Sequence, residues 1–144
     1  MPAMKSLMLS VALLAACGAS QKEVAVQGKD LDLARVAGDW EGEYKGNESG
    51  RTGPVTFSLA MGSHTAEGQV VMSGTTPLKI EFVKVNDDEV RGTIVPYTDP
   101  TCSCEVQTTF NGTVTNDSIS GTFETKVSAT GQTQSGSWFA SRKR

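Results

Sequence analysis

Apolar and charged residues alternate strictly along residues 38–45. Trp40, Gly42 and Tyr44 share one parity, and three acidic residues with Lys45 take the other. A period of two is typical of a half-buried strand, whose apolar face turns inward while its charged face meets water. This segment is the first strand that the pattern predicts.

The same alternation recurs in seven later segments, which are separated by short runs rich in Gly, Asn, Asp, Ser and Thr. Such runs form turns, and hairpin-length connections make neighbouring strands antiparallel. The pattern therefore predicts about eight short strands and no long helix. The seven later segments lie at residues 54–61, 68–72, 78–82, 90–94, 102–114, 119–123 and 136–140.

An all-β, antiparallel up-and-down barrel of about eight strands is the architecture that this pattern favours, with a β-sandwich as the alternative. Pairing the first strand with the last removes both open edges that a sheet would otherwise expose. A short helical turn is expected over residues 31–37, with Asp30 as its cap and Gly38 as its stop. We expect this turn to cover one end of the barrel.

The first sixteen residues have the pattern of an export signal. Lys5 supplies a positive charge, and residues 7–16 form an apolar run that is too short to cross a bilayer. The run ends in Leu-Ala-Ala followed by Cys17 and Gly18, which resembles the lipobox of bacterial lipoprotein precursors. The alternative is an ordinary secretory signal in which Cys17 is incidental.

The lipobox resemblance implies cleavage before Cys17 and acylation of that residue, which would anchor the protein to a membrane. Gly18, standing where an Asp would retain such a protein at the inner membrane, implies the outer membrane, with the protein facing the periplasm. The chain then divides into a signal peptide over 1–16, a lipidated Cys17 with a flexible tether over 17–30, and a barrel over 31–144.

A second resemblance rests on Gly38-x-Trp40, which is similar to the opening motif of the lipocalin and calycin barrels. In that family a basic residue at the end of the last strand packs over the Trp, and Arg142 stands at the matching place. The resemblance therefore implies a cation–π clamp of Trp40 by Arg142 at the barrel base. No second lipocalin motif is evident, so the resemblance concerns the fold.

Six glycines share the parity of the inward apolar residues of their strands, and this has two interpretations. The glycines either leave space for a ligand or make room for facing aromatic side chains, because an eight-stranded barrel is near the size at which side chains alone fill it. A continuous apolar cavity on the order of 300 Å³ or more would favour the first interpretation. The candidate ligand contacts are Trp40, Tyr44, Phe57, Met72, Phe82, Phe110, Phe123 and Trp138.

Cys102 and Cys104 are a closely spaced pair in a chain predicted to be exported, and an oxidising compartment favours a disulfide between them. On a flat strand their Cα atoms would lie about 6.6 Å apart, at the long edge of disulfide geometry, but Pro100 could introduce a bend that shortens this distance. The alternatives are two thiols, a redox-active pair or a thiolate metal site. A zinc site needs four ligands, and with His64 and scattered acids as the remaining candidates we predict no metal and no cofactor.

The formal net charge of −3 and a basic cluster confined to residues 142–144 do not suggest a nucleic-acid partner. His64 stands in a predicted turn without recognisable Ser or Asp partners, so we do not predict an enzyme. We expect an envelope barrel, anchored to the membrane by lipid, that binds a small apolar or amphipathic molecule. The alternative is a filled barrel whose loops at 46–53 and 128–133 contact an envelope protein.

Overall fold

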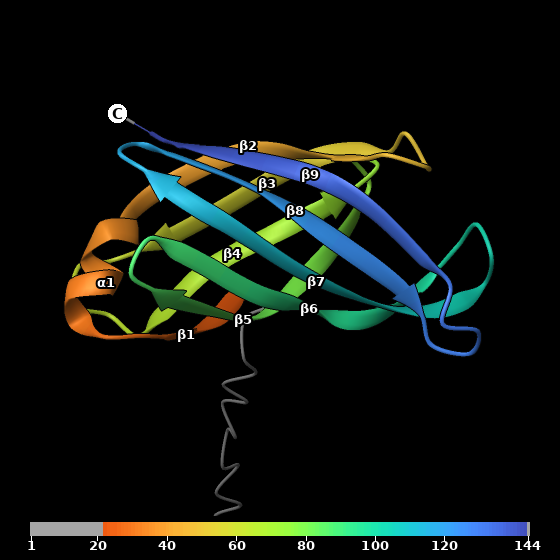
Figure 1. Ribbon diagram of the computed structural model, residues 1–144, viewed down its shortest axis with the longest axis horizontal. Coiled ribbons are helices and arrows are strands. Elements are labelled where there is room, and N and C mark those ends of the chain that lie inside the picture. Colours follow the sequence, from red (N-terminus) through yellow and green to blue (C-terminus); the bar gives the residue numbers. More distant parts are fainter. Residues whose placement is uncertain (1–21, 144) are drawn as a thin grey trace, which may run out of the picture.

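The computed structural model describes residues 22–143, which form nine β-strands and one short helix (Figure 1). The strands wrap into a closed barrel, and the helix α1 lies at one end of it. The elements in chain order are β1 (Glu23–Gln27), α1 (Asp30–Val36), β2 (Gly38–Gly46), β3 (Thr52–Leu59), β4 (Thr65–Met72), β5 (Thr76–Asn86), β6 (Glu89–Asp99), β7 (Cys104–Thr115), β8 (Ser118–Val127) and β9 (Thr133–Arg142).

Strands β2 to β9 follow one another around the barrel in up-and-down order. Each pairs antiparallel with the next, and β2 pairs with β9 from Trp40–Arg142 to Gly46–Gly136, which closes the ring. The predicted antiparallel barrel is therefore confirmed, and the chain does not form the alternative β-sandwich. The eight predicted strands correspond to β2 through β9.

The ninth strand, β1, lies where the sequence predicted a flexible tether. It enters between β4 and β5, antiparallel to the first and parallel to the second, with Val24 opposite Ala66 and Val26 opposite Val83. Val24 is fully buried and Val26 is 4% exposed, so this short strand adds to the core. The tether prediction is wrong for residues 23–27, whereas the signal segment, Cys17 and Gly18 lie outside the described residues.

The helix α1 covers one end of the barrel, as predicted, by burying Leu33 and Val36 against the main core. Its cap differs from the prediction, because Lys29 holds the N-cap position and Asp30 is the first helical residue. The Asp30 carboxylate lies 3.1 Å from Nε2 of His64 instead of capping the helix. Within residues 22–143, no helix is both long and apolar enough to cross a membrane.

A β-bulge in β5 changes which of its side chains face the interior. The pairing with β6 shifts between Ile80 and Phe82, so that Val83 and Val85 are buried while Phe82 is only partly buried. The extra residue reverses the inward and outward parity that the simple alternation would give. Phe82, predicted to face inward, instead pairs with the exposed residue Ala25.

A second bulge, in β6, turns two polar side chains toward the interior. The pairing with β7 shifts between Ile94 and Tyr97, where three steps along β6 match two steps along β7. Val95 and Pro96 form this irregular stretch, and the parity beyond it brings Tyr97 and Asp99 to the inner face. The sequence predicted a loop here, and the bulged strand replaces it.

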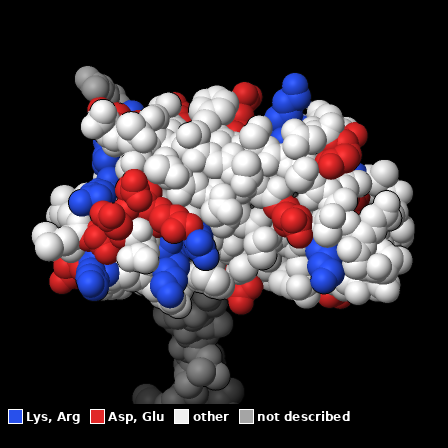
Figure 2. Space-filling model, in the orientation of Figure 1, with Lys and Arg blue, Asp and Glu red and all other residues white. Residues whose placement is uncertain are grey.

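Charged side chains are spread over the outer surface in both signs. Figure 2 shows acidic and basic residues interspersed on one face, with uncharged surface between them. The apolar interior divides into a large cluster centred on β1, α1, β5 and β6, and a smaller one of Trp40, Ile119 and Ala140.

Candidate functional site

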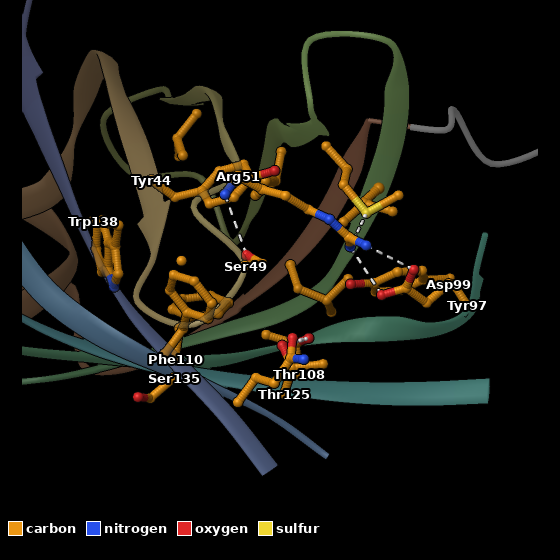
Figure 3. Close-up of a pocket in the computed structure, with 18 of the residues that line it drawn as sticks. Tyr44, Ser49, Arg51, Tyr97, Asp99, Thr108, Phe110, Thr125, Ser135 and Trp138 are labelled. Carbon is orange, nitrogen blue, oxygen red and sulfur yellow. Dashed lines mark hydrogen bonds and ion pairs between the residues drawn. The ribbon is translucent and has the colours of Figure 1, made fainter. Parts of the chain in front are cut away.

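A cavity of about 110 Å³ lies inside the barrel toward the end opposite α1 (Figure 3). Its walls come from β2 through β9, and its rim is formed by the β2–β3 connection and the end of β6. Most of the wall is aliphatic or aromatic. The aliphatic part consists of Val55, Val70, Leu78, Ile80 and Ile94.

Five of the eight predicted ligand contacts line this cavity: Tyr44, Met72, Phe110, Phe123 and Trp138. The other three do not. Trp40 and Phe57, together with Trp138, line a smaller cavity of about 50 Å³ near α1. Phe82 lines neither cavity, because the β5 bulge has changed its parity.

Three of the six inward glycines, Gly92, Gly112 and Gly136, make room for facing aromatic rings, as one of the two interpretations predicted, whereas Gly42 and Gly121 lie against backbone atoms. A Cβ atom added at Gly92 would lie 2.4 Å from the Phe110 ring, and one at Gly136 would lie 2.2 Å from the Phe123 ring. The same addition at Gly112 would meet Trp138 at 2.6 Å. The interior is thus partly filled by these rings, and the remaining space is smaller than the roughly 300 Å³ at the lower end of drug-sized ligand pockets.

The aromatic rings of the wall are held in place by contacts among themselves and with the backbone. Tyr44 meets Phe123 edge-on at 5.8 Å between ring centroids, and Phe110 meets Trp138 in the same way at 5.9 Å. The Tyr44 hydroxyl accepts a hydrogen bond from the backbone N–H of Ser73 at 3.0 Å. Edge-on pairs and anchored polar tips fix ring orientation, so this wall is pre-formed.

A bidentate ion pair forms the polar rim of the cavity. Nη1 of Arg51 donates to one carboxylate oxygen of Asp99 at 2.8 Å, and Nη2 donates to the other at 3.0 Å. Nη2 also donates to the Thr101 hydroxyl, and Nη1 lies 3.5 Å from the sulfur of Met72. The pair ties the β2–β3 connection to the end of β6 across the barrel mouth (Figure 3).

Burial and hydrogen bonding shift the pKa values of two groups at this rim. Burial opposes the charge of Asp99, but the backbone N–H of Thr101 and the guanidinium of Arg51 outweigh it and hold the carboxyl pKa below its usual value. Burial raises the pKa of the Tyr97 hydroxyl, which Asp99 raises further. At neutral pH the rim therefore combines a compensated ion pair with a neutral phenol.

The opposite end of the barrel carries the predicted clamp. The guanidinium carbon of Arg142 lies 4.4 Å from the ring centroid of Trp40, and Nη2 donates to the carbonyl of Arg35 at 2.8 Å. The indole N–H of Trp40 donates to the carbonyl of Val36 at 2.9 Å. These contacts join the last strand to α1, so the cation–π contact is confirmed as a structural feature.

A disulfide joins Cys102 to Cys104, as the sequence predicted. Their Cα atoms are 5.1 Å apart, because Cys102 lies in the turn before β7 and Ser103 adopts a left-handed backbone with φ of 51°. The placement of Cys102 on a strand is therefore wrong. The bond closes a small loop next to Thr101, one of the residues that hold Arg51.

The polar residues of the cavity were not identified from the sequence. Arg51, Tyr97 and Asp99 lay in segments predicted to be loops, and Thr108 was assigned to a strand without a role. The available signal was the spacing of Tyr97 and Asp99, which continues an alternation one residue out of step with Ile94. The exposed His64, by contrast, lies at the α1 end and is not part of the cavity lining.

The lining of the cavity, as far as the chain is described, holds no histidine or cysteine and one carboxylate, that of Asp99. Among residues 22–143, no three His, Cys, Asp or Glu side chains gather in an arrangement suited to a metal ion. A comparison with protein-family models finds no match for the chain, and a comparison with curated proteins finds none either. Arguments about function therefore rest on the barrel and its cavity.

Proposed function

We propose that this protein is a lipid-anchored lipoprotein of the bacterial envelope whose barrel binds one small apolar or amphipathic molecule. The observation that carries the proposal is the cavity of about 110 Å³, with apolar walls and a polar rim. Binding sites for small molecules commonly combine apolar surface with a few well-placed polar groups. No catalytic role is proposed for any residue.

The size of the cavity limits the ligand. An engineered protein cavity of about 150 Å³ lined by Leu, Ile and Phe holds benzene, so a cavity of similar size accommodates about one ring or a short branched chain. A long acyl chain would require the aromatic rings facing Gly92, Gly112 and Gly136 to move. The proposed ligand is therefore compact.

The anchor part of the proposal is supported by the sequence alone. Cys17 follows Leu-Ala-Ala and a short apolar run, which is the arrangement expected of a lipoprotein precursor. Several acyl chains on one residue hold a protein to a membrane stably, whereas one chain binds only marginally. With Gly18 after the cysteine, we propose the periplasmic face of the outer membrane.

Binding of toluene to the mature protein tests the ligand-binding proposal. We expect toluene to broaden or shift NMR signals of the cavity residues and to raise the thermal midpoint in proportion to its concentration. Val70→Phe, which fills the cavity, should abolish both effects. Val71→Phe is the matched control, because Val71 is the next residue of β4 and is not part of the lining.

The alternative function, a filled barrel that contacts an envelope protein through its loops, is favoured by the glycine–aromatic pairs that occupy much of the interior. If toluene changes neither the NMR signals nor the thermal midpoint of the wild type, and Val70→Phe and Val71→Phe give the same result, the ligand proposal is excluded in favour of this alternative. Crosslinking in intact cells would then identify the partner.

A further inference from the structure

The positive charge at the cavity rim, that of Arg51, is already paired with a carboxylate of the protein. Both Nη atoms of Arg51 donate hydrogen bonds to Asp99, and they also contact the Thr101 hydroxyl and the Met72 sulfur (Figure 3). Its side chain is only 23% exposed, so water does little to free it from these partners. Among the described residues, Arg51 is the one cation that lines the cavity.

The negative charge at the rim, that of Asp99, is likewise already hydrogen-bonded within the protein. One oxygen of Asp99 accepts from Arg51 and from the backbone N–H of Thr101 at 2.8 Å, and the other oxygen accepts from Arg51. The carboxylate side chain is 11% exposed. A ligand cation would have to compete with a fixed guanidinium for these oxygens, and a ligand anion would meet a carboxylate beside the arginine.

The remaining polar side chains that line the cavity are uncharged, and apart from the amide of Gln134 and the indole of Trp138 they are hydroxyls. Oγ1 of Thr108 lies 2.7 Å from Oγ1 of Thr125, and both residues line the cavity with the phenol of Tyr97 (Figure 3). Hydroxyls donate and accept hydrogen bonds but cannot neutralise a charge. Moving an unpaired charge from water into such a site is strongly unfavourable.

Building on the proposed function, we infer that the cavity selects uncharged ligands, and that the Arg51–Asp99 pair is the residue pair that excludes carboxylates. An arginine at a barrel mouth is a suitable carboxylate receptor when its bidentate face is free. Here Asp99 occupies that face, so Arg51 has a structural role and is not available to a ligand carboxylate. The ligand that we expect is a compact neutral molecule with at most one hydrogen-bonding group.

Benzamide and benzoate test this inference, because they have nearly the same shape and differ in charge at pH 7. Titration of the mature wild-type protein, with toluene as the reference ligand, should give at least tenfold tighter binding for benzamide than for benzoate. In Asp99→Asn the guanidinium loses its ionic partner, and the affinity for benzoate, divided by the affinity of the same variant for toluene, should rise at least tenfold over the wild-type ratio. Asp88→Asn, in an exposed turn outside the cavity, is the charge-matched control and should behave as wild type.

Equal affinities of the wild type for benzamide and benzoate would overturn the inference and leave the binding function intact. A wild type that binds none of the three ligands would instead overturn the proposed function, and this inference with it. The wild-type comparison decides whether the cavity selects uncharged ligands even if Asp99→Asn does not fold.

Discussion

Arg51 and Asp99 form the most buried of the ion pairs identified among the described residues. Neither residue belongs to a regular alternation of apolar positions, yet together they join two chain segments 48 positions apart. A pair of this kind is costly to break from one side, because the remaining partner is left without compensation. The pair should therefore affect stability as well as the proposed choice of ligand.

The pH dependence of unfolding should reveal Asp99. Its pKa is lower in the folded protein than in the unfolded chain, so its stabilising contribution is present above the ordinary Asp pKa of about 3.9 and is lost as the pH falls through the lower folded value. Urea unfolding between pH 7 and pH 2.5 should show a steeper acid loss for wild type than for Asp99→Asn. At pH 7 we expect this variant to be less stable by about 1–3 kcal/mol. Parallel pH curves for the two proteins would contradict the assignment.

Arg142 should contribute more to stability than its neighbour Lys143. Arg142→Ala removes the contact with Trp40 and the hydrogen bonds to the carbonyls of Arg35 and Ala37, and we expect a loss of about 2 kcal/mol in the free energy of unfolding. Lys143→Ala removes one exposed ion pair to Glu41 and should change stability by less than about 1 kcal/mol. Thermal and urea unfolding of both variants provide the comparison, and equal losses would mean that the clamp has no special role.

The sequence predicted single residues well where the alternation is unbroken. Trp40, Tyr44, Phe110, Phe123 and Trp138 all face an internal cavity, as their parity required. Residues beyond a bulge were predicted poorly, because one extra residue reverses every later side chain of the strand. Local alternation does not report where such an insertion occurs, since a bulge is fixed by pairing with the neighbouring strand.

At the scale of elements, β1 differs most from the sequence-based expectation. It has five residues, of which three are apolar and two are buried, and only Gly28 at its end marks a boundary in the sequence. Without neighbouring strands to pair with, this segment would not be expected to form a β-strand. It is ordered because β4 and β5 pair with each other only from Gln69–Lys79 to Met72–Thr76 and then accept β1 between them.

Substitutions in β1 should destabilise the whole barrel. Val24 is fully buried, so Val24→Ala removes apolar surface from the core and should cost about 2 kcal/mol. Ala25→Ser, at an exposed position of the same strand, should change the free energy of unfolding by less than about 0.5 kcal/mol. Urea unfolding measures both, and a negligible cost for Val24→Ala would show that β1 is dispensable for the fold.

At the scale of the whole molecule, closure of the barrel was predictable and its interior was not. Even spacing of strands and turns is sufficient to indicate an up-and-down barrel, because few other arrangements pair every edge. The balance between filled and empty space depends on how each ring packs against the glycine opposite it. The amount of empty space is a property of the assembled barrel, so it cannot be predicted from the composition of single strands.

The anchor can be tested on the complete chain in its native host. Cys17→Ser should abolish acylation and mature processing, and the protein should leave the membrane fraction, while the barrel retains its far-ultraviolet circular dichroism. Mass spectrometry of the mature amino terminus and fractionation of cell extracts measure these outcomes. An unmodified residue 17 or a retained leader in the wild type would refute the anchor.

The position of β1 also limits the distance between the proposed lipid anchor and the barrel. Residues 18–22 separate Cys17 from β1, and an extended chain covers at most about 3.6 Å per residue, so acylated Cys17 would hold Glu23 within roughly 20 Å of the lipid. Glu23 lies opposite Glu67 of β4, on the wall of the barrel. If Cys17 is acylated as proposed, so short a connection to the barrel wall would favour a barrel that lies on its side against the membrane. The mouth framed by Arg51 and Asp99 would then open along the membrane surface, and ligands would approach it from the side.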